Sequence, residues 1–190
     1  MAYHSPVQLP KDAPTLIFVT GSLEAGLGKK IFGIGCYGEN RTEVYKGLDT
    51  HEGRTVHMGD DLFAPAGSPV FAVADGRLLS FTDNTAFGDY GPTLIIEHQL
   101  NSGKVVYALY GHLSRKSLEG KEEGQPVNAG QKIGEIGDKS VNGGWAAHLH
   151  LQLSWIKPEV CDMPGVVAPS DFEVAKKTYL RPRSVLGNIY

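Results

Sequence analysis

The strictest pattern in the sequence is the alternation of polar and apolar residues from His148 to Leu153, which read HLHLQL. Side chains on a β-strand alternate between its two faces, so His148, His150 and Gln152 are predicted to share one face and the three leucines the other. The two histidines then stand about 6.6–6.8 Å apart along the backbone. The pattern indicates a core strand that presents a pair of histidines to a functional surface; a half-buried strand with two exposed histidines is the alternative.

Short apolar segments separated by turn residues predict a mostly antiparallel, all-β fold for the rest of the chain. The 24 glycines and 11 prolines favour tight turns over a helical bundle. Asp75-Gly76 is expected to join two strands in a hairpin, and a second hairpin is expected to turn at 101–103. The predicted strands lie within 16–21, 29–38, 70–74, 77–81, 92–100, 104–113, 124–137 and 148–155. Beyond them we expect a loop, a short helix at 173–180 and an extended final ten residues.

The distribution of these patterns predicts three parts. Residues 1–50 form an N-terminal extension of unknown role, residues 51–156 a catalytic domain, and residues 157–190 a C-terminal extension. No secretory signal is visible at the start, so the chain as it stands is expected to be cytoplasmic, or exported if a leader precedes it. The two cysteines, Cys36 and Cys161, are predicted to be free thiols, in preference to a disulfide.

Charge and hydrophobicity exclude several classes of partner. The formal net charge of −3 provides no basic surface for nucleic acid and no polybasic patch for a membrane. No stretch approaches the roughly 20 apolar residues of a membrane span.

Two residues with metal-ligand chemistry stand close together in the segment HMGDD. His57 offers a ring nitrogen and Asp61 a carboxylate oxygen, both of which bind zinc. A histidine followed closely by an aspartate is more often a surface ion pair, so this segment is weak evidence alone. Combined with His150, it provides the three protein ligands of a catalytic zinc site, which leaves a fourth position for water.

Further histidines supply candidates for proton transfer. His112 ends an apolar strand where a sheet meets its loops, and an unperturbed histidine pKa near 6.5 suits acid–base work at neutral pH. His112 and His148 are therefore predicted to be catalytic residues beside the metal. His98, in the segment IIEHQ, is read as a structural histidine near the end of a strand.

Several blocks between Arg54 and Trp155 together resemble the lysostaphin/LytM-type zinc endopeptidases. They are RTVHMGDDLFAPAGSPVFAVADGRL, YGPTLIIEH, YALYGHLS, GQPVNAGQKIGEIG and NGGWAAHLHLQL, in that order. The family pattern His-x-Gly-x-Asp falls on His57 and Asp61. The pattern His-x-His falls on His148 and His150.

The resemblance implies a duplicated-hybrid-motif β-sandwich and one Zn²⁺ per chain, held by His57, Asp61 and His150. It also implies that His112 and His148 are catalytic. The expected substrate is a peptide, in most family members a stem or cross-link peptide of bacterial peptidoglycan. The loop SVNGGWAAHLH differs from the usual small-residue loop of the family. Its Asn142 and Trp145 are candidates for substrate binding.

The sequence leaves three alternatives open. The first is a non-catalytic binding or activator domain on the same fold, although such domains have usually lost a ligand. The second is a zinc peptidase with a cytosolic substrate outside the wall. The third is a phosphocarrier of the same fold, which has no need for Asp61 beside His57. Neither the scissile bond nor the oligomeric state follows from the sequence.

Overall fold

The computed structural model describes residues 3–18, 22–28, 30–46, 51 and 53–190. Its β-strands, in chain order, are β1 (Gly33–Gly35), β2 (Val56–His57), β3 (Asp60–Phe63), β4 (Pro69–Phe71), β5 (Gly76–Asn84), β6 (Gly91–Gln99), β7 (Val105–Gly111), β8 (Pro126–Val127), β9 (Lys132–Glu135), β10 (His148–Ser154), β11 (Val166–Val167) and β12 (Tyr179–Leu180). The helices are short: α1 (Leu23–Leu27), α2 (Thr42–Tyr45), the 3-10 helix η2 (Arg115–Leu118), α3 (Phe172–Ala175) and α4 (Pro182–Leu186).

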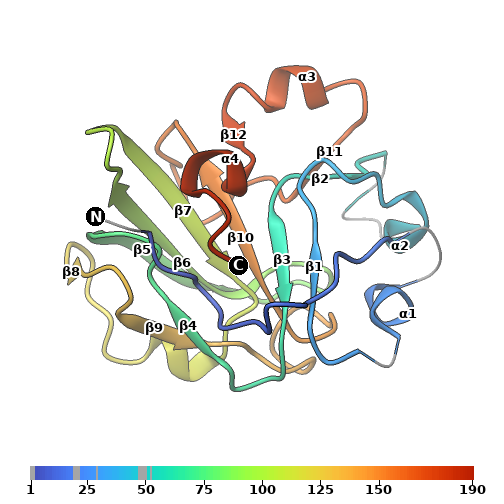
Figure 1. Ribbon diagram of the computed structural model, residues 1–190, viewed down its shortest axis with the longest axis horizontal. Helices are drawn as coiled ribbons and strands as arrows, with labels where there is room; N and C mark the ends of the chain where they lie inside the picture. The colour runs from blue at the N-terminus through green and yellow to red at the C-terminus, as the bar shows by residue number, and fades with distance from the viewer. Residues whose placement is uncertain (1–2, 19–21, 29, 47–50, 52) are drawn as a thin grey trace.

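The main sheet has the strand order β1-β3-β10-β7-β6-β5-β8, with β12 paired to β10 (Figure 1). All of its pairings are antiparallel. Strands β4 and β9 form a separate two-stranded ribbon, as do β2 and β11. Side chains of β4 and β9 share one hydrophobic core with the main sheet, which gives the predicted β-sandwich.

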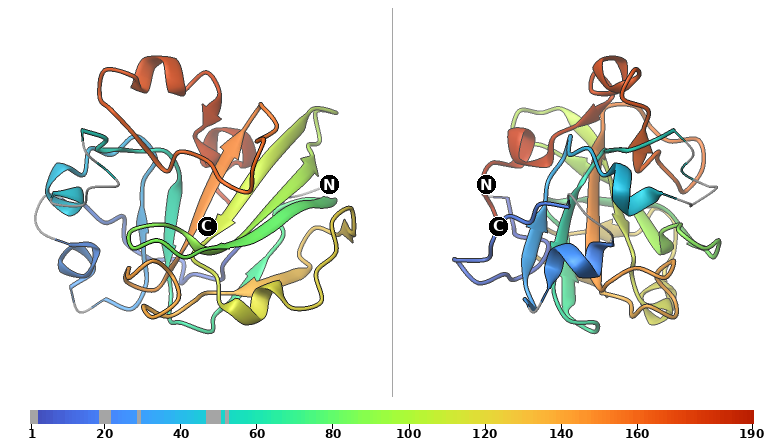
Figure 2. Two further views of the ribbon diagram at one scale, coloured as in Figure 1. Left: turned by 180° about the vertical axis from the view of Figure 1, so that it is seen from behind. Right: turned by 90° about the vertical axis from the view of Figure 1, so that its right-hand side faces the viewer.

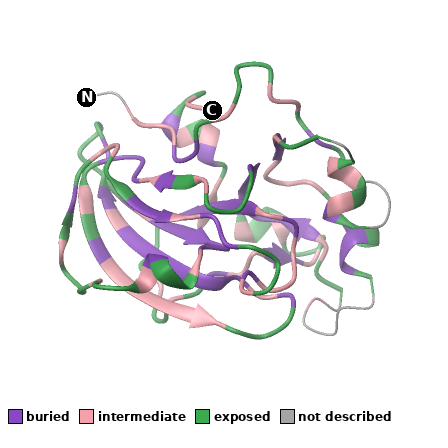
Figure 3. Cartoon of the chain, turned by 90° about the horizontal axis from the view of Figure 1, so that it is seen from below, coloured by how far each residue is buried: buried purple, intermediate pink, exposed green. Residues whose placement is uncertain are grey.

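The alternation along β10 has the predicted result. Leu149, Leu151 and Leu153 are fully buried in the main core. His148 and His150 lie on the other face of the strand and are also buried, at 2% and 3% exposure, so the alternative of exposed histidines is wrong. Figure 3 shows that buried residues concentrate along the central strands.

The second predicted hairpin is confirmed, because β6 and β7 pair from Leu94↔Tyr110 to Gln99↔Val105. The first is wrong: β4 pairs with β9, and β5 pairs with β6 and β8. The chain passes from one layer of the sandwich to the other at 72–75, and Gly76 already belongs to β5. Alternating apolar residues indicate a buried strand without showing which strand it pairs with.

Segments outside 51–156 add strands to the sheet. From the N-terminal side β1 pairs with β3, and from the C-terminal side β12 pairs with β10. Helices α1 and α2 lie at the β1 end of the sheet, as Figures 1 and 2 show. Of the predicted strand at 16–21, residues 19–21 lie outside the described residues and Leu16 lies next to an isolated bridge between Thr15 and Ile34.

The C-terminal segment differs in part from its prediction. The expected helix at 173–180 is only α3, because Tyr179 and Leu180 form β12 instead. The final ten residues are not extended throughout, since they contain α4, which begins at Pro182. Proline suits a first helical turn because its missing N–H has no partner there to lose. Both cysteines are free thiols, each half-buried.

No helix in the described part of the chain is long and apolar enough to cross a membrane.

Candidate metal centre

Four neighbouring strands position the candidate ligands. Across the sheet, Gly35 of β1 pairs with Asp61 of β3, Asp61 pairs with His150 of β10, and His150 pairs with Gly111 of β7. His57 enters from β2, just before the turn that leads into β3. Antiparallel pairing therefore places residues that are far apart in sequence directly beside each other.

The three predicted ligands converge on one point. Asp61 Oδ1 lies 2.9 Å from His150 Nδ1 and 3.2 Å from His57 Nε2, and these two nitrogens are 3.1 Å apart. All three side chains are buried. In a tetrahedral site with zinc–ligand distances of about 2.0–2.1 Å, ligand atoms are about 3.3–3.4 Å apart. The observed spacing is close to that of one face of such a tetrahedron.

Acceptors on the far side of each ring set the tautomer in which that ring would bind a metal. His57 Nδ1 is 3.1 Å from the Cys36 carbonyl oxygen, which only accepts, so this nitrogen carries the proton. His150 Nε2 donates in the same way to Gln152 Oε1 at 3.1 Å. The orientation of the Gln152 amide is itself set, because its Nε2 donates to the Pro164 carbonyl.

In that tautomer, His57 Nε2, His150 Nδ1 and Asp61 Oδ1 turn three lone pairs toward one another. Burial lowers the pKa of His57 to about 4, with a further contribution from the Arg41 charge, so its ring is neutral at pH 7. Three acceptors at this separation repel unless a cation lies among them. The donor set of two nitrogens and one carboxylate oxygen fits Zn²⁺.

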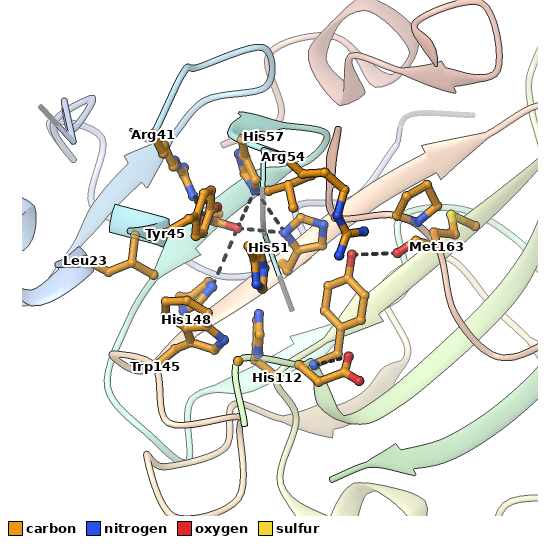
Figure 4. A pocket seen from close by; sticks show the side chains of 18 of the residues that line it. Leu23, Arg41, Tyr45, His51, Arg54, His57, His112, Trp145, His148 and Met163 are labelled. Carbon is orange, nitrogen blue, oxygen red and sulfur yellow. Dashed lines mark hydrogen bonds and ion pairs between the residues drawn. The ribbon is translucent and has the colours of Figure 1, made fainter. Parts of the chain in front are cut away.

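The two predicted catalytic histidines, His148 and His112, lie beside this cluster, and each donates from Nδ1 to a backbone carbonyl oxygen. His148 Nδ1 donates to the Ala146 carbonyl oxygen at 2.6 Å, and His112 Nδ1 donates to the Asn142 carbonyl oxygen at 2.9 Å. Their Nε2 atoms are thus the unprotonated ones, and His148 Nε2 lies 3.6 Å from Asp61 Oδ1. Their ring centroids are 4.3 Å apart, and Figure 4 shows both rings directed at the space beside His57.

Burial lowers the pKa of both of these rings. For His112 the pKa falls well below its usual value, and repulsion from His148 and His150 adds to the effect of burial. For His148 burial is again the first cause. Both rings are therefore neutral proton acceptors at pH 7.

His112 also has an unusual backbone. Its φ of 61° is the only positive value of a non-glycine residue among the described part of the chain. Such strain collects at functional sites, where the surrounding structure holds it in place. Here the His112 N–H donates to the Tyr90 carbonyl oxygen at 2.8 Å, which holds the backbone, and the Asn142 carbonyl oxygen holds the ring.

The glycine of His-x-Gly-x-Asp has a steric role. A Cβ on Gly59 would lie 2.6 Å from His150 Cε1 and 2.7 Å from its Nε2. Any side chain at this position would push the His150 ring out of place. The glycine of the motif thus permits close approach of the backbone to the candidate ligand His150.

The five residues line one pocket together with residues from loops and from the N-terminal segment. One wall is aromatic: the Tyr45 and His51 rings stack at 4.8 Å, and Trp145 meets both edge-on. The other residues that line it include Leu23, Arg41, Arg54, Asp89, Tyr90, Asp162 and Met163.

The two candidates for substrate binding are placed differently. Trp145 lines the pocket, whereas the Asn142 side chain is fully buried and does not line it. The Asn142 amide closes its own loop through the N–H and carbonyl of Trp145, both at 3.0 Å. His98 lies outside the pocket, buried between the Tyr110 hydroxyl and the Asp75 carbonyl.

Three residues that contact the candidate ligands were not among the predicted site residues. Arg41 donates from Nη1 to Asp61 Oδ2 at 2.6 Å, and it lies in the segment 1–50, for which the sequence predicts only an extension of unknown role. Tyr90 donates through its hydroxyl to the Met163 carbonyl at 3.0 Å and lies against His150. Gln152 was placed on the correct face of β10 without a role; its position two residues after His150 was the available signal.

Comparison with known proteins agrees with this geometry. The model of peptidase family M23 matches residues 55–161, more than half of the chain. The chain belongs to peptidase family M23. All five candidate ligand and catalytic residues lie within the matched range, whereas Arg41 lies before it.

Among M23 relatives, the chain is 33% identical over 125 residues to the peptidoglycan DD-endopeptidase ShyB of Vibrio cholerae, a match that covers 65% of this chain and 25% of ShyB. It therefore spans about a quarter of that relative.

Two solved structures share its fold. Lysostaphin from Staphylococcus simulans, an antimicrobial peptidase, matches with a TM-score of 0.52 and 25% identity over 83% of this chain and 51% of lysostaphin. A catalytic-domain variant of the prophage-encoded M23 protein EnpA of Enterococcus faecalis matches with a TM-score of 0.50 and 25% identity, over 75% of this chain and 92% of that domain. The lysostaphin-like, mostly antiparallel β fold predicted from the sequence is confirmed.

Proposed function

We propose that the chain is a zinc metalloendopeptidase that hydrolyses peptide bonds in the stem or cross-link peptides of bacterial peptidoglycan. The observation that carries the proposal is the convergence of three lone pairs, from His57, Asp61 and His150, beside two further neutral histidines in one pocket. We propose one Zn²⁺ per chain, with these three residues as ligands. The substrate class is supported by ShyB, named a peptidoglycan DD-endopeptidase, which this chain matches over part of its length.

A bound Zn²⁺ would supply Lewis acidity, which polarises a carbonyl and lowers the pKa of a coordinated water to about 7. The chain's own residues would accept and donate the protons of the reaction. The Nε2 atoms of His112 and His148 are unprotonated, so either can accept a proton from the attacking water. The same nitrogen, once protonated, can donate to the developing oxyanion or to the leaving amine.

The substrate would lie along the aromatic wall of the pocket. We propose that Trp145 contacts it, because the ring is half-exposed and is held in place by Tyr45 and His51. Asn142 is proposed to act indirectly, by holding the loop whose carbonyl orients His112. On this basis Trp145→Ala should raise KM without loss of zinc, and an unchanged KM would remove Trp145 from the substrate site.

We propose residues 51–156 as the catalytic domain, because they contain all five ligand and catalytic residues. Residues 1–50 and 157–190 are proposed as extensions that complete its sheet through β1 and β12.

The alternative of a non-catalytic binding domain has little support in this geometry, since the full ligand set and both accessory histidines are present. The phosphocarrier alternative does not account for the carboxylate of Asp61 between two histidine nitrogens.

The proposal is tested by metal analysis together with digestion of purified peptidoglycan sacculi. We expect one zinc per chain and release of soluble fragments that stops on chelation and returns with added zinc. Zinc without release would direct attention to non-wall peptides. A folded protein that binds no zinc would contradict the proposal.

A further inference from the structure

Arg41 is a buried cation at the metal centre that the M23 match does not include. It precedes α2, its side chain is 1% exposed, and it lines the same pocket as the proposed ligands. A guanidinium removed from water is costly unless it is paired and hydrogen-bonded. Its ion pair with Asp61 at 2.6 Å offsets part of this cost.

The two oxygens of Asp61 have different partners. Oδ2 accepts the 2.6 Å bond from Arg41 Nη1. Oδ1 faces His57, His150 and His148, at 3.2, 2.9 and 3.6 Å. A carboxylate can bind a metal through one oxygen or through both. With Oδ2 held by a short charge-assisted bond to Arg41, Oδ1 is the oxygen that faces the histidine nitrogens.

The position of the guanidinium is fixed by its surroundings. Its Nε donates to Glu39 Oε2 at 3.1 Å, and Glu39 Oε1 accepts the Phe18 N–H at 3.1 Å. The Phe18 ring lies 4.6 Å from the guanidinium carbon. On the remaining side, a Cβ on Gly35 would lie 2.5 Å from Nη2, so only glycine leaves room for Arg41 there.

We propose that Arg41 is a positioning residue that restricts Asp61 to binding the metal through Oδ1 alone, which keeps the fourth coordination position open for water. The inference rests on the metal site proposed above. A catalytic zinc site depends on that open position, and an aspartate bound through both oxygens would crowd it. The N-terminal segment would then be part of the metal centre and not only a flank of the domain.

The competing explanation is structural: the Arg41–Asp61 pair only anchors the N-terminal segment to the sheet. The two differ in what happens at the metal. Loss of an anchor lowers stability and leaves the coordination geometry unchanged. Loss of a positioning residue frees Oδ2, which becomes a fifth donor atom beside water and the three proposed ligand atoms.

The test is the visible absorption spectrum of the cobalt(II)-substituted protein, because four-coordinate cobalt(II) absorbs several-fold more strongly than five-coordinate cobalt(II). We expect a strong, four-coordinate spectrum for the natural sequence and a several-fold weaker one for Arg41→Met. Arg41→Lys keeps the charge and should restore most of the intensity. Gly35→Ala places a Cβ 2.5 Å from Arg41 Nη2 and 3.3 Å from Asp61 Cβ, so it displaces Arg41 with only slight crowding of Asp61, and should reproduce the weak spectrum.

Gly33→Ala on the same strand is the matched control. A Cβ there would meet Leu16 at 2.5 Å, so the variant disturbs packing but not Arg41. It should lower the melting temperature and keep the strong spectrum. Circular dichroism establishes that each variant is folded; if Arg41→Met does not fold, Gly35→Ala and Arg41→Lys decide.

The inference is overturned if folded Arg41→Met or Gly35→Ala binds cobalt with the natural spectrum, or if Gly33→Ala weakens the spectrum equally. A natural protein that binds no cobalt would instead overturn the proposed function, so the two failures are distinguishable.

Discussion

His57 Nε2 and His150 Nδ1 lie 3.1 Å apart, and the opposite nitrogen of each ring already donates its proton to an oxygen. The two facing nitrogens are therefore both acceptors, with Asp61 Oδ1 as a third acceptor beside them. Because three acceptors face one another, the ion that the site accepts is a cation.

Removal of the carboxylate should abolish metal binding. Asp61→Ala deletes the only anionic ligand and leaves the buried Arg41 paired with Glu39 alone, so zinc and activity should be lost together. Metal analysis after dialysis measures this. His98→Gln serves as the control, since that buried histidine lies outside the pocket and should leave zinc unchanged. Full zinc content in Asp61→Ala would exclude Asp61 as a ligand.

His112 should be needed for turnover and not for the metal. Its Nε2 lies beside the ligand cluster, and general acid–base groups contribute about 10²–10⁴-fold to rate. We expect His112→Ala to keep one zinc per chain and to lose kcat by a factor in this range. Steady-state kinetics on a soluble cross-linked muropeptide, together with zinc analysis, separate the two effects. Zinc loss in this variant would mean that ligand and catalyst are assigned the wrong way round.

Gln152 should tune metal affinity through His150. Its Oε1 accepts the His150 Nε2 proton and so fixes Nδ1 as the ligand atom. Loss of such an outer partner costs about 10–100-fold in metal affinity or activity, and we expect Gln152→Leu to weaken zinc binding by that amount. Competition with a chelator of known affinity provides the measurement. Ser154→Ala, one step further along the same face of β10, should have no such effect; equal weakening in both variants would point to general destabilisation.

His98 should make stability depend on pH. Burial lowers its pKa from 6.5 to about 4. Between these two pH values the unfolded state therefore binds a proton at His98 that the folded state does not. Its contribution is complete above pH 6.5 and is lost as pH falls toward 4, by roughly 3 kcal/mol at most. Urea unfolding at pH 7 and pH 5 should show a smaller drop for His98→Gln than for the natural protein. Identical drops would show that His98 does not titrate in this window.

The sequence was sufficient to bring the three candidate ligands together because their patterns are local. The alternation around His150 predicts a strand face, and the spacing of His57 and Asp61 places both near one turn. The same reasoning failed for the hairpin at Asp75-Gly76, because the pairing of β4 with β9 depends on residues some sixty positions away. A turn dipeptide reports local geometry and not which sheet each strand joins.

Arg41 was beyond prediction for a similar reason. It meets Asp61 only because β1 pairs with β3 in a register that places Gly35 opposite Asp61. No short motif around Arg41 distinguishes it from an exposed loop residue. Its role depends on a tertiary contact between two segments, together with the space that Gly35 leaves open.

The most direct test of the central claim is hydrolysis of a purified, peptide-cross-linked muropeptide dimer by the zinc-loaded protein, followed by mass spectrometry. We predict conversion of the dimer to monomers with the gain of one water, complete inhibition by a zinc chelator and recovery on zinc addition. An intact dimer after incubation with folded, zinc-loaded protein, or cleavage that continues after the zinc is removed, would contradict the account.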